Sequence, residues 1–418
     1  MPDRATFPAG LNIAVLSRSV FPLHGVGGLE RHVYDLVAAL VERDVHITLI
    51  TREGHRHVTL GALGDRRVTI QTIPYRTFPG ANRPGTTILD RSTAYPLFGY
   101  RAGRVAAALA EAGLVDLVYG LGASTLGYAL VRGRRPGSTR PFVFNPQGLE
   151  EFGGMDGSYG GRRAKGIGYA PLRWAVRICS NAADRVIATD RAIEPAIARH
   201  LGVGSDRMRL VPNAIDLSGC DRLAASGDGD QMRTRHGIDS EETVLLSVGR
   251  IERNKGFHVL VDALATMRDL TWRWVLVGDG PFRHRLEERV RSAGLADRVL
   301  LPGRVDDRTL HAWYEAATLF VHPTLYEGSS IVTLEAMAHR RTVVASHAGG
   351  LPDKVRHGKT GWLVPPGDPA ALASGLRHAL AERAHLPAMG VAGRALVEAE
   401  FSWTVVTDRM LAVFSELL

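Results

Sequence analysis

Cysteine is scarce in this sequence. Only Cys179 and Cys220 occur among the 418 residues, and neither has C-x-x-C spacing or histidines close to it. A disulfide framework and a zinc finger both need more cysteines at closer spacing. We therefore expect a reduced, cytoplasmic protein.

Apolar runs long enough to cross a membrane are missing too. No stretch reaches the ~20 residues of a membrane span. The apolar run near the N-terminus is short and carries Arg18. We interpret it as the lead-in to a first strand and not as a signal peptide.

Nucleic-acid motifs are absent as well. The sequence has no zinc-finger spacing, no aromatic-basic RNA motif and no recognition-helix signature, so nucleic acid is not an expected partner. The net charge of +8 then leaves three interpretations open: a solvated basic surface, a phosphate-bearing ligand, or peripheral contact with the anionic inner face of a membrane.

What the chain does contain is a regular alternation of short apolar runs with helical patterns. Strands are expected at residues 11–17, 46–51, 68–73, 115–120, 141–146 and 185–190, and again at 243–250, 272–280, 298–305, 317–324, 341–349 and 360–368. Between the later strands, helices are expected near 256–267, 281–293, 306–316 and 328–338. Continuous apolar strands separated by amphipathic helices indicate parallel sheets covered on both faces.

The length suits two domains of about 150–200 residues each. We predict an α/β protein with two Rossmann-like, doubly wound parallel-sheet domains over residues 1–214 and 215–400. The polar, Gly-rich stretch 218–237 is expected to be a linker with an entry helix. A last helix, 401–418, is expected to pack back on the first domain.

In open parallel sheets, ligands bind beyond the carboxyl ends of the strands. The segment GRIERNKG (249–256) follows an expected strand, and there Arg250 and Lys255 are expected to converge on one anion. The P-loop spacing is absent. A solvated basic turn is the alternative.

The segment TLYEGSSIVTLEAMA (324–338) follows another expected strand. Gly328, Ser329 and Ser330 are expected to begin a helix whose free N–H groups bind an anion. Glu327 precedes that helix, level with a sugar, and Glu335 is expected about two turns into it, level with a ribose. Two alternatives are that both glutamates are structural, or that they form the acid and nucleophile of a glycosidase.

Two other segments carry weaker patterns. GVGGLERH (25–32) gives a glycine loop before a helix but lacks the third glycine of a dinucleotide motif. The aspartates Asp228 and Asp230 have the spacing of a metal-binding Asp-x-Asp pair but lie in the expected linker.

Taken together, RIERNKGFHVLVDALA, VGDGPFRHRLEE, LPGRV and HPTLYEGSSIVTLEAMA resemble family 4 of the retaining glycosyltransferases, which have the GT-B fold. The resemblance covers nearly the whole chain and is strongest over 243–368. It implies a donor site for a nucleoside diphosphate sugar at Gly27, Gly28, Arg250, Lys255, Arg304, Val305, Glu327, Gly328, Ser329, Ser330, Ile331, Val332 and Glu335.

Within that set, the resemblance implies catalytic roles for Glu327, Arg250 and Lys255. Arg250 and Lys255 would bind the diphosphate, Glu327 the donor-sugar hydroxyls and Glu335 the ribose. Because the basic residues can supply the charge stabilisation, we expect that neither a metal nor a cofactor is required. The acceptor, a small molecule, a glycan or a lipid-linked molecule, would lie near His24, Gln147 and Glu150.

The sequence departs from the family pattern on the acceptor side. Many members carry histidine where this chain has Leu121, and a His-Gly pair where it has Gln147-Gly148. Two alternatives to a retaining glycosyltransferase therefore stay open. One is a sugar-nucleotide epimerase that uses Glu150 and Glu151, and the other is a binding module without catalysis.

Overall fold

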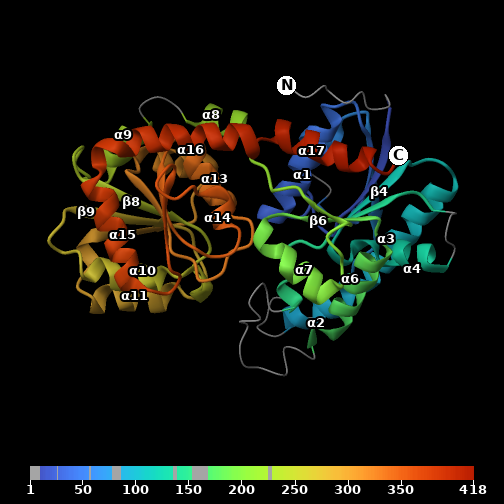
Figure 1. Ribbon diagram of the computed structural model, residues 1–418, viewed down its shortest axis with the longest axis horizontal. Helices are drawn as coiled ribbons and strands as arrows, with labels where there is room; N and C mark the ends of the chain where they lie inside the picture. The colour runs from blue at the N-terminus through green and yellow to red at the C-terminus, as the bar shows by residue number, and fades with distance from the viewer. Residues whose placement is uncertain are drawn as a thin grey trace. The chain divides into compact units, whose positions relative to one another are not determined.

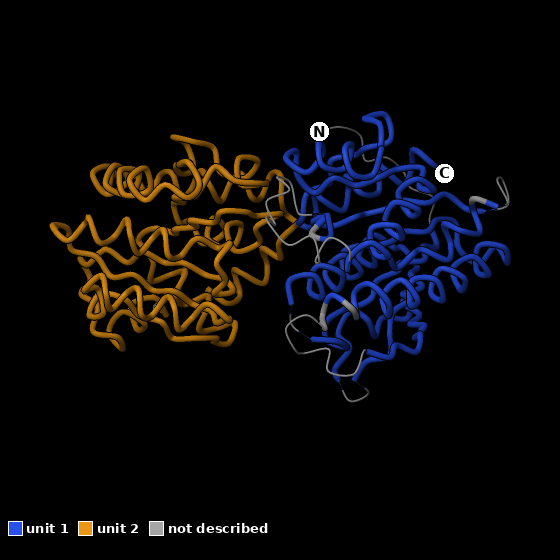
Figure 2. The backbone as a smooth tube through the Cα atoms, turned by 90° about the horizontal axis from the view of Figure 1, so that it is seen from below, with its two compact units in different colours: residues 1–213, 403–418 blue, residues 214–402 orange. Residues whose placement is uncertain are grey.

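The computed structural model describes residues 10–25, 27–55, 58–77, 86–134, 139–152, 168–224 and 228–418. The chain divides into two compact units, residues 1–213 with 403–418 and residues 214–402 (Figure 2). Each unit contains one parallel sheet with helices on both of its faces.

Unit 1 is built on a seven-stranded sheet with the order β3-β2-β1-β4-β5-β6-β7. Its strands are β1 (Asn12–Leu16), β2 (His46–Arg52), β3 (Val68–Ile73), β4 (Leu117–Leu121), β5 (Phe142–Asn145), β6 (Arg185–Ala188) and β7 (Met208–Leu210). Its helices are α1 (Gly28–Val41), α2 (Thr86–Ser92), α3 (Ala94–Glu111), α4 (Leu126–Arg134), α6 (Ala170–Ala182), α7 (Glu194–Leu201) and α17 (Trp403–Ser415).

The two faces of this sheet are covered by different helices. Helices α3, α4, α6 and α7 contribute to one apolar core with the strands, and α1 and α17 pack together over the other face (Figure 1). The central strand β1 pairs in parallel with β2 through Ile13 and Ile47 and with β4 through Ile13 and Leu117. Side chains on both faces of β1 are therefore buried, which explains its unbroken apolar sequence.

Unit 2 is built on a six-stranded sheet with the order β10-β9-β8-β11-β12-β13. Its strands are β8 (Thr243–Val248), β9 (Trp272–Val277), β10 (Val299–Gly303), β11 (Leu319–His322), β12 (Thr342–Ser346) and β13 (Gly361–Val364). Its helices are α8 (Leu217–Leu223), α9 (Asp228–Arg235), α10 (Phe257–Ala265), α11 (Arg283–Ser292), α12 (Asp307–Ala316), α13 (Ile331–Ala338), α14 (Leu351–Lys354), α15 (Pro369–Ala381) and α16 (Leu386–Glu400).

Two apolar cores lie on the two faces of the second sheet. Residues of α12, α13 and α16 fill one core, and residues of α10, α11 and α15 fill the other (Figure 1). The predicted fold class, two doubly wound parallel-sheet domains, is therefore confirmed.

Two local expectations were wrong. Strand β7 was not predicted, because its sequence MRL is short and half-polar. The expected linker 218–237 instead carries most of α8 together with α9, and both helices pack against α12. Residues 225–227 of this stretch lie outside the described residues. Within the part of the chain that the structure describes, no helix is both long and apolar enough to cross a membrane.

Helix α17 is held to unit 1 by charged and apolar contacts. Glu416 accepts hydrogen bonds from Arg185 at 2.8 Å and from Arg209 at 2.6 Å. Phe414 is fully buried, and its ring contacts that of Tyr119 in β4, with 6.0 Å between the ring centroids. The last helix in the sequence thus completes the core of the first unit.

We expect Phe414→Ala to lower the free energy of unfolding by about 3–5 kcal/mol, because the substitution leaves a cavity against β4. Denaturant unfolding followed by circular dichroism measures the effect. Leu418→Ala is the matched control, since Leu418 is 52% exposed and its loss should change stability by less than about 0.5 kcal/mol. Equal small effects of the two substitutions would contradict this role of α17.

Candidate functional site

The strand order of unit 2 fixes where a ligand can bind. Strands β8 and β11 are neighbours, while the chain continues from β8 to β9 on one side and from β11 to β12 on the other. Such a switch point opens a crevice at the carboxyl ends of the strands. The loops that follow β8 and β11 contain Lys255 and Glu327.

These two loops dock directly on each other. The carbonyl oxygen of Asn254 accepts hydrogen bonds from the Leu325 amide at 2.7 Å and from the Thr324 hydroxyl at 3.1 Å. Gly256 has φ of +68°, and a Cβ atom added to it would lie 1.8 Å from the carbonyl oxygen of Pro323. Only glycine fits this close approach, which brings the neighbouring Lys255 to the end of β11.

Lys255, His322 and Glu327 form a compact group, here named the Glu327 cluster. The Lys255 ammonium donates to Glu327 Oε2 at 2.7 Å, and His322 Nε2 lies 2.7 Å from the same oxygen. The side chains of Lys255 and Glu327 are 21% and 11% exposed, and His322 is buried. The cluster therefore holds a charged carboxylate that is mostly buried but still partly accessible to solvent.

The charge of Glu327 is set by competing effects. Burial alone would raise the pKa of this carboxyl group, but the Lys255 ammonium and the hydrogen bond to His322 outweigh burial and lower the pKa to about 2. The group is therefore ionised throughout the physiological pH range and can only accept hydrogen bonds.

His322 was not among the predicted site residues. It ends the apolar strand β11, and a polar residue in that position just before Pro323 was the signal that could have indicated it. Because Nε2 lies against the Glu327 carboxylate, which can only accept, Nε2 donates this hydrogen bond. Its Nδ1 atom is buried and has no hydrogen-bond partner among the described residues.

Arg250 lies on the same loop as Lys255 but has a different partner. Its Nε atom is 3.0 Å from Glu252, and its side chain is 67% exposed. An ion pair this exposed contributes at most about 1 kcal/mol. Arg250 can therefore leave Glu252 for a more strongly charged partner at small cost.

The helix after Glu327 begins later than predicted. Helix α13 starts at Ile331 and not at Gly328, because Ser330 is its N-cap and accepts a hydrogen bond from the Thr333 amide. Glu335 is consequently about one turn into the helix, not two. The first N–H groups of α13 remain without helical partners, and the buried Ser329 hydroxyl beside them has no partner among the described residues.

Glu335 is oriented by a buried tyrosine that the sequence did not single out. The Tyr314 hydroxyl donates to Glu335 Oε2 at 2.7 Å. Burial raises the pKa of Tyr314, and the charge of Glu335 raises it further. The tyrosine therefore stays a hydrogen-bond donor and fixes one carboxylate oxygen.

Behind Glu335 lie the only three side chains of the described residues that are placed as a metal-binding group. Donor atoms of Cys220, His311 and His339 lie within 4.8 Å of one another. His339 Nδ1 contacts the Glu315 carboxylate, and His339 Nε2 is 2.7 Å from His311 Nδ1. These ring nitrogens already have hydrogen-bond partners, so we assign the group to the packing of α12 against α13.

The Asp-x-Asp pattern does not form a pair of ligands. Asp228 and Asp230 both lie in the first turn of α9, and positions i and i+2 of a helix do not face each other. The carboxylate of Asp228 pairs with Arg308 at 3.3 Å.

The remaining predicted donor residues lie at strand ends or helix starts. Arg304 is exposed and Val305 half-buried just after β10. Gly27 is the N-cap of α1 and Gly28 its first residue, and no side chain caps this helix. These glycines belong to unit 1, so their contact with a diphosphate stays a prediction.

Among the residues predicted for the acceptor side, His24 has a positioning role. Its Nδ1 atom is 3.0 Å from the Val20 amide and its Nε2 atom 2.8 Å from the Arg52 carbonyl oxygen. Burial lowers the pKa of His24, which favours the neutral ring that these two contacts require. His24 thus ties the loop after β1 to the end of β2.

The other two predicted acceptor residues, Gln147 and Glu150, follow β5, and the departure from the family pattern at Leu121 lies in β4. Leu121 is the buried last residue of β4. Gln147 has φ of +65°, and its buried Nε2 atom has no partner among the described residues. Glu150 begins a short 3₁₀ turn, but its side chain is outside the described set, as are residues 153–167 of the predicted acceptor loop.

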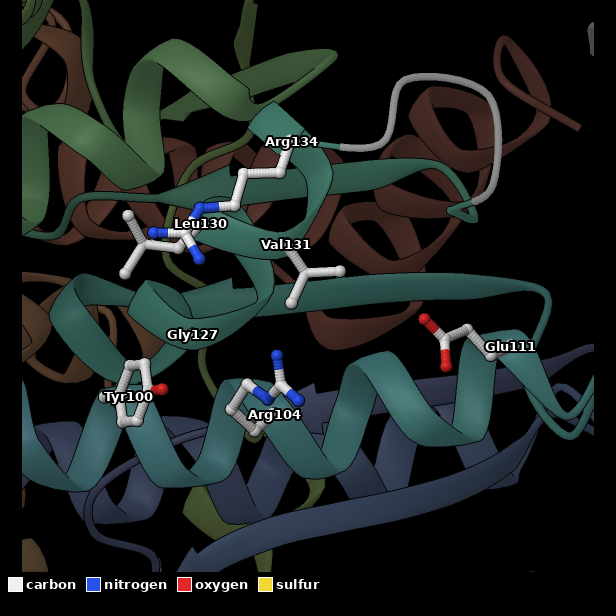
Figure 3. Close-up of a pocket in the computed structure, with 7 residues that line it drawn as sticks. All are labelled: Tyr100, Arg104, Glu111, Gly127, Leu130, Val131 and Arg134. Carbon is white, nitrogen blue, oxygen red and sulfur yellow. The ribbon is translucent and has the colours of Figure 1, made fainter.

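A separate cavity of about 240 Å³ lies between α3 and α4 of unit 1 (Figure 3). Arg104 and Glu111 of α3 and Arg134 of α4 line it. All its lining residues belong to these two helices, so it lies in the helical layer and not at the strand ends. We do not assign it to the site.

Comparison with known sequences adds an independent result. Residues 26–218 match the family model described as Glycosyltransferase Family 4, and residues 242–382 match the model described as Glycosyl transferases group 1.

Three curated relatives are similar to this chain. A D-inositol 3-phosphate glycosyltransferase of Catenulispora acidiphila is 34% identical over 56% of this chain and 57% of that protein. The alpha-maltose-1-phosphate synthase of Mycolicibacterium smegmatis is 32% identical over 60% and 68%. The alpha-D-kanosaminyltransferase of Streptomyces kanamyceticus is 30% identical over 59% and 64%. The chain thus spans between 57% and 68% of the length of these three relatives.

Solved structures resemble the whole chain. A sucrose-phosphate synthase from Thermosynechococcus elongatus has a TM-score of 0.76 and 25% identity, covering 97% of this chain and 99% of that one. Anabaena HepE in complex with UDP has a TM-score of 0.72 and 20% identity, covering 97% and 100%. Together with the two parallel sheets, these neighbours show the GT-B fold.

The depressed pKa of Glu327 predicts a specific pH dependence of stability. The folded chain keeps this carboxylate ionised down to about pH 2, whereas the ordinary value is 4.5. The resulting stabilisation is present above about pH 4.5 and is lost as the pH falls towards 2.

Glu327→Gln should remove that dependence, because the amide does not titrate. Between pH 7 and pH 3, wild type should lose about 2 kcal/mol more stability than the variant does. Denaturant unfolding at a series of pH values measures the difference. Parallel stability curves for the two proteins would contradict the ion pair.

Proposed function

The chain belongs to glycosyltransferase family 4, and from that premise we propose that it transfers a sugar from a nucleoside diphosphate sugar to an acceptor, with retention of the anomeric configuration. The observation that carries the proposal is the Glu327 cluster at the β8–β11 switch point, directly before the start of α13. It combines a cation, a carboxylate that is ionised at physiological pH and a helix start whose first N–H groups have no partners within the helix.

Each part of this group suits one part of the donor. The Lys255 ammonium and the N-terminus of α13 would stabilise the negative charge that develops on the departing diphosphate. Arg250 would move from Glu252 to the same diphosphate, where a guanidinium binds two oxygens at once. Lys255 and the start of α13 are in place before the donor binds, so only Arg250 has to change its position.

Glu327 would accept hydrogen bonds from hydroxyl groups of the donor sugar. Its Oε2 atom is already held by Lys255 and His322, which orients the carboxylate. Glu335, oriented by Tyr314, would accept hydrogen bonds from the ribose, as acidic residues do in dinucleotide sites. Arg304 and Val305 would lie beside the base.

For retention we propose attack on the same face of the sugar as the leaving group. The acceptor oxygen bonds to the anomeric carbon as the carbon–phosphate oxygen bond breaks, and a phosphate oxygen takes the acceptor's proton. The cationic residues of the site supply the charge stabilisation, so we propose that no metal is required.

The proposal names the donor as a nucleoside diphosphate sugar. It does not specify the base, the sugar or the acceptor molecule. HepE, a neighbour in fold, has been solved with UDP and with UDP-glucose, which makes these the first compounds to test. A cytoplasmic location with peripheral membrane contact also stays a prediction. Both cysteines are free and buried, which agrees with a reducing compartment.

The proposed function is tested by incubating the protein with uridine, guanosine, adenosine and thymidine diphosphate sugars, with and without sugar and sugar-phosphate acceptors. We expect acceptor-dependent release of the nucleoside diphosphate from one donor class, persisting in excess chelator. Nuclear magnetic resonance of the product gives the anomeric configuration.

Other outcomes of this assay separate the rival functions. A changed sugar without acceptor would indicate the epimerase, and binding without turnover a module that lacks catalysis. Loss of activity in chelator that magnesium or manganese restores would contradict the metal-free mechanism.

Glu327 and Glu335 should contribute to different steps. Glu327→Gln should lower kcat more than donor affinity, because contacts to the reacting sugar strengthen in the transition state. Glu335→Gln should mainly weaken nucleotide binding, by roughly 10–150-fold for one hydrogen bond to a charged group.

Calorimetric titration with the bare nucleoside diphosphate separates the two roles, because that ligand has no donor sugar. Glu335→Gln should impair its binding and Glu327→Gln should barely change it. The opposite pattern would mean that the two carboxylates bind the reverse parts of the donor.

A further inference from the structure

Unit 1 has its own switch point, and it too is lined by charged residues. Strands β1 and β4 are neighbours, while the chain continues from β1 to β2 and β3 on one side and from β4 to β5 on the other. Arg18 follows β1 closely, and Arg52 is the last residue of β2. Both arginines therefore lie at the carboxyl edge of the sheet, where open α/β sheets bind ligands.

Each of these arginines is stacked on a tyrosine ring. The Arg18 guanidinium carbon is 4.7 Å from the centroid of the Tyr95 ring, and that of Arg52 is 5.4 Å from the centroid of the Tyr75 ring. The tyrosines are themselves fixed by hydrogen bonds from their hydroxyl groups, Tyr75 to Asp90 at 2.9 Å and Tyr95 to the Leu121 carbonyl oxygen at 3.1 Å. The stacking therefore holds both guanidinium planes in place.

The charge of this pair is not neutralised by a direct ion pair among the described residues. Among the described residues, neither Arg18 nor Arg52 forms an ion pair, and the buried Nε atom of Arg52 has no hydrogen-bond partner. Burial lowers the pKa of Arg52 and the neighbouring Arg18 lowers it further, while Tyr75, Glu30 and Asp90 act in the opposite direction. An arginine cannot lose its proton in a protein, so both guanidinium groups stay charged and are available to bind an anion.

The backbone around the pair is also fixed. His24 Nε2 contacts the Arg52 carbonyl oxygen at 2.8 Å, and His24 Nδ1 contacts the loop that carries Arg18 through the Val20 amide at 3.0 Å. One histidine thus joins the two chain segments that present the arginines. A preorganised site loses little conformational freedom when its ligand binds.

From this geometry we propose that Arg18 and Arg52 bind an anionic group of the acceptor, a phosphate monoester or a carboxylate. The assignment to the acceptor rests on the proposed function, in which the donor is bound by Lys255, Glu327 and Glu335 of unit 2. Each guanidinium group has planar N–H donors that can bind two oxygens of a carboxylate or a phosphate at once. A neutral acceptor would leave the Arg52 Nε donor and the mutual repulsion uncompensated.

Three matched acceptors test the proposal: a hexose phosphate, the uronic acid of that hexose, and the neutral hexose. Wild type should use one or both charged acceptors and discriminate against the neutral one. Arg52→Gln and Arg18→Gln should each lower kcat/KM for the charged acceptor by roughly 10–150-fold. The KM of the donor and its slow hydrolysis without acceptor should stay unchanged.

Arg66→Gln is the control, because Arg66 is an exposed arginine of the same unit and its loss should change none of these values. Arg52→Lys keeps the positive charge but lacks the paired N–H donors of a guanidinium group, so it should retain only part of the activity. Equal use of charged and neutral acceptors by wild type would overturn the proposal. A raised donor KM in the arginine variants would overturn it too, because the pair would then bind the donor.

Titration of inorganic phosphate by calorimetry tests the site without any turnover. Wild type should bind phosphate, and Arg52→Gln and Arg18→Gln should bind it at least tenfold more weakly. This result would support the anion site even if no donor is turned over, in which case only the proposed function fails. Absence of phosphate binding to wild type, or equal binding to all variants, would refute the anion site.

Discussion

The geometry of the candidate site in unit 2 depends on the ion pair between Lys255 and Glu327. A carboxylate that is 11% exposed would ordinarily be protonated or excluded from such a place. It is tolerated because a cation and a histidine meet the same oxygen at 2.7 Å. Removing one partner leaves a buried charge uncompensated. The resulting loss in the free energy of unfolding is larger than the stabilisation that the intact pair contributes. The geometry around the pair must therefore be maintained closely.

The backbone supplies that geometry. Gly256 lets the loop after β8 approach Pro323, and the carbonyl oxygen of Asn254 binds the loop after β11 at two points. Because β8 and β11 are adjacent parallel strands, both loops leave the sheet at the same edge. The parallel topology brings the two segments together, the glycine sets their separation, and the ion pair then fixes the side chains.

The sequence was informative where one physical signal dominated. All six strands of unit 2 were expected near their observed positions, because continuous apolar runs have few alternatives in a parallel sheet. It was less informative where two signals compete. Ser330 is both an apparent helix residue and a good N-cap, and its capping moved the start of α13 to Ile331. His322 was indicated only by its place before Pro323, whereas Tyr314 acts through a contact across 21 positions of the chain, which local patterns do not encode.

The two switch points differ in how their charges are balanced, and the difference suits different ligands. At β8 and β11 the cation is already paired with a carboxylate, so an anionic ligand bound there would share Lys255 with Glu327, and hydroxyl groups of that ligand would find an oriented acceptor. At β1 and β4 the guanidinium groups rest on tyrosine rings and form no ion pair among the described residues. A ring quadrupole attracts a cation without neutralising it. The first arrangement therefore favours a ligand with both phosphate and hydroxyl groups, and the second favours a ligand that brings its own negative charge.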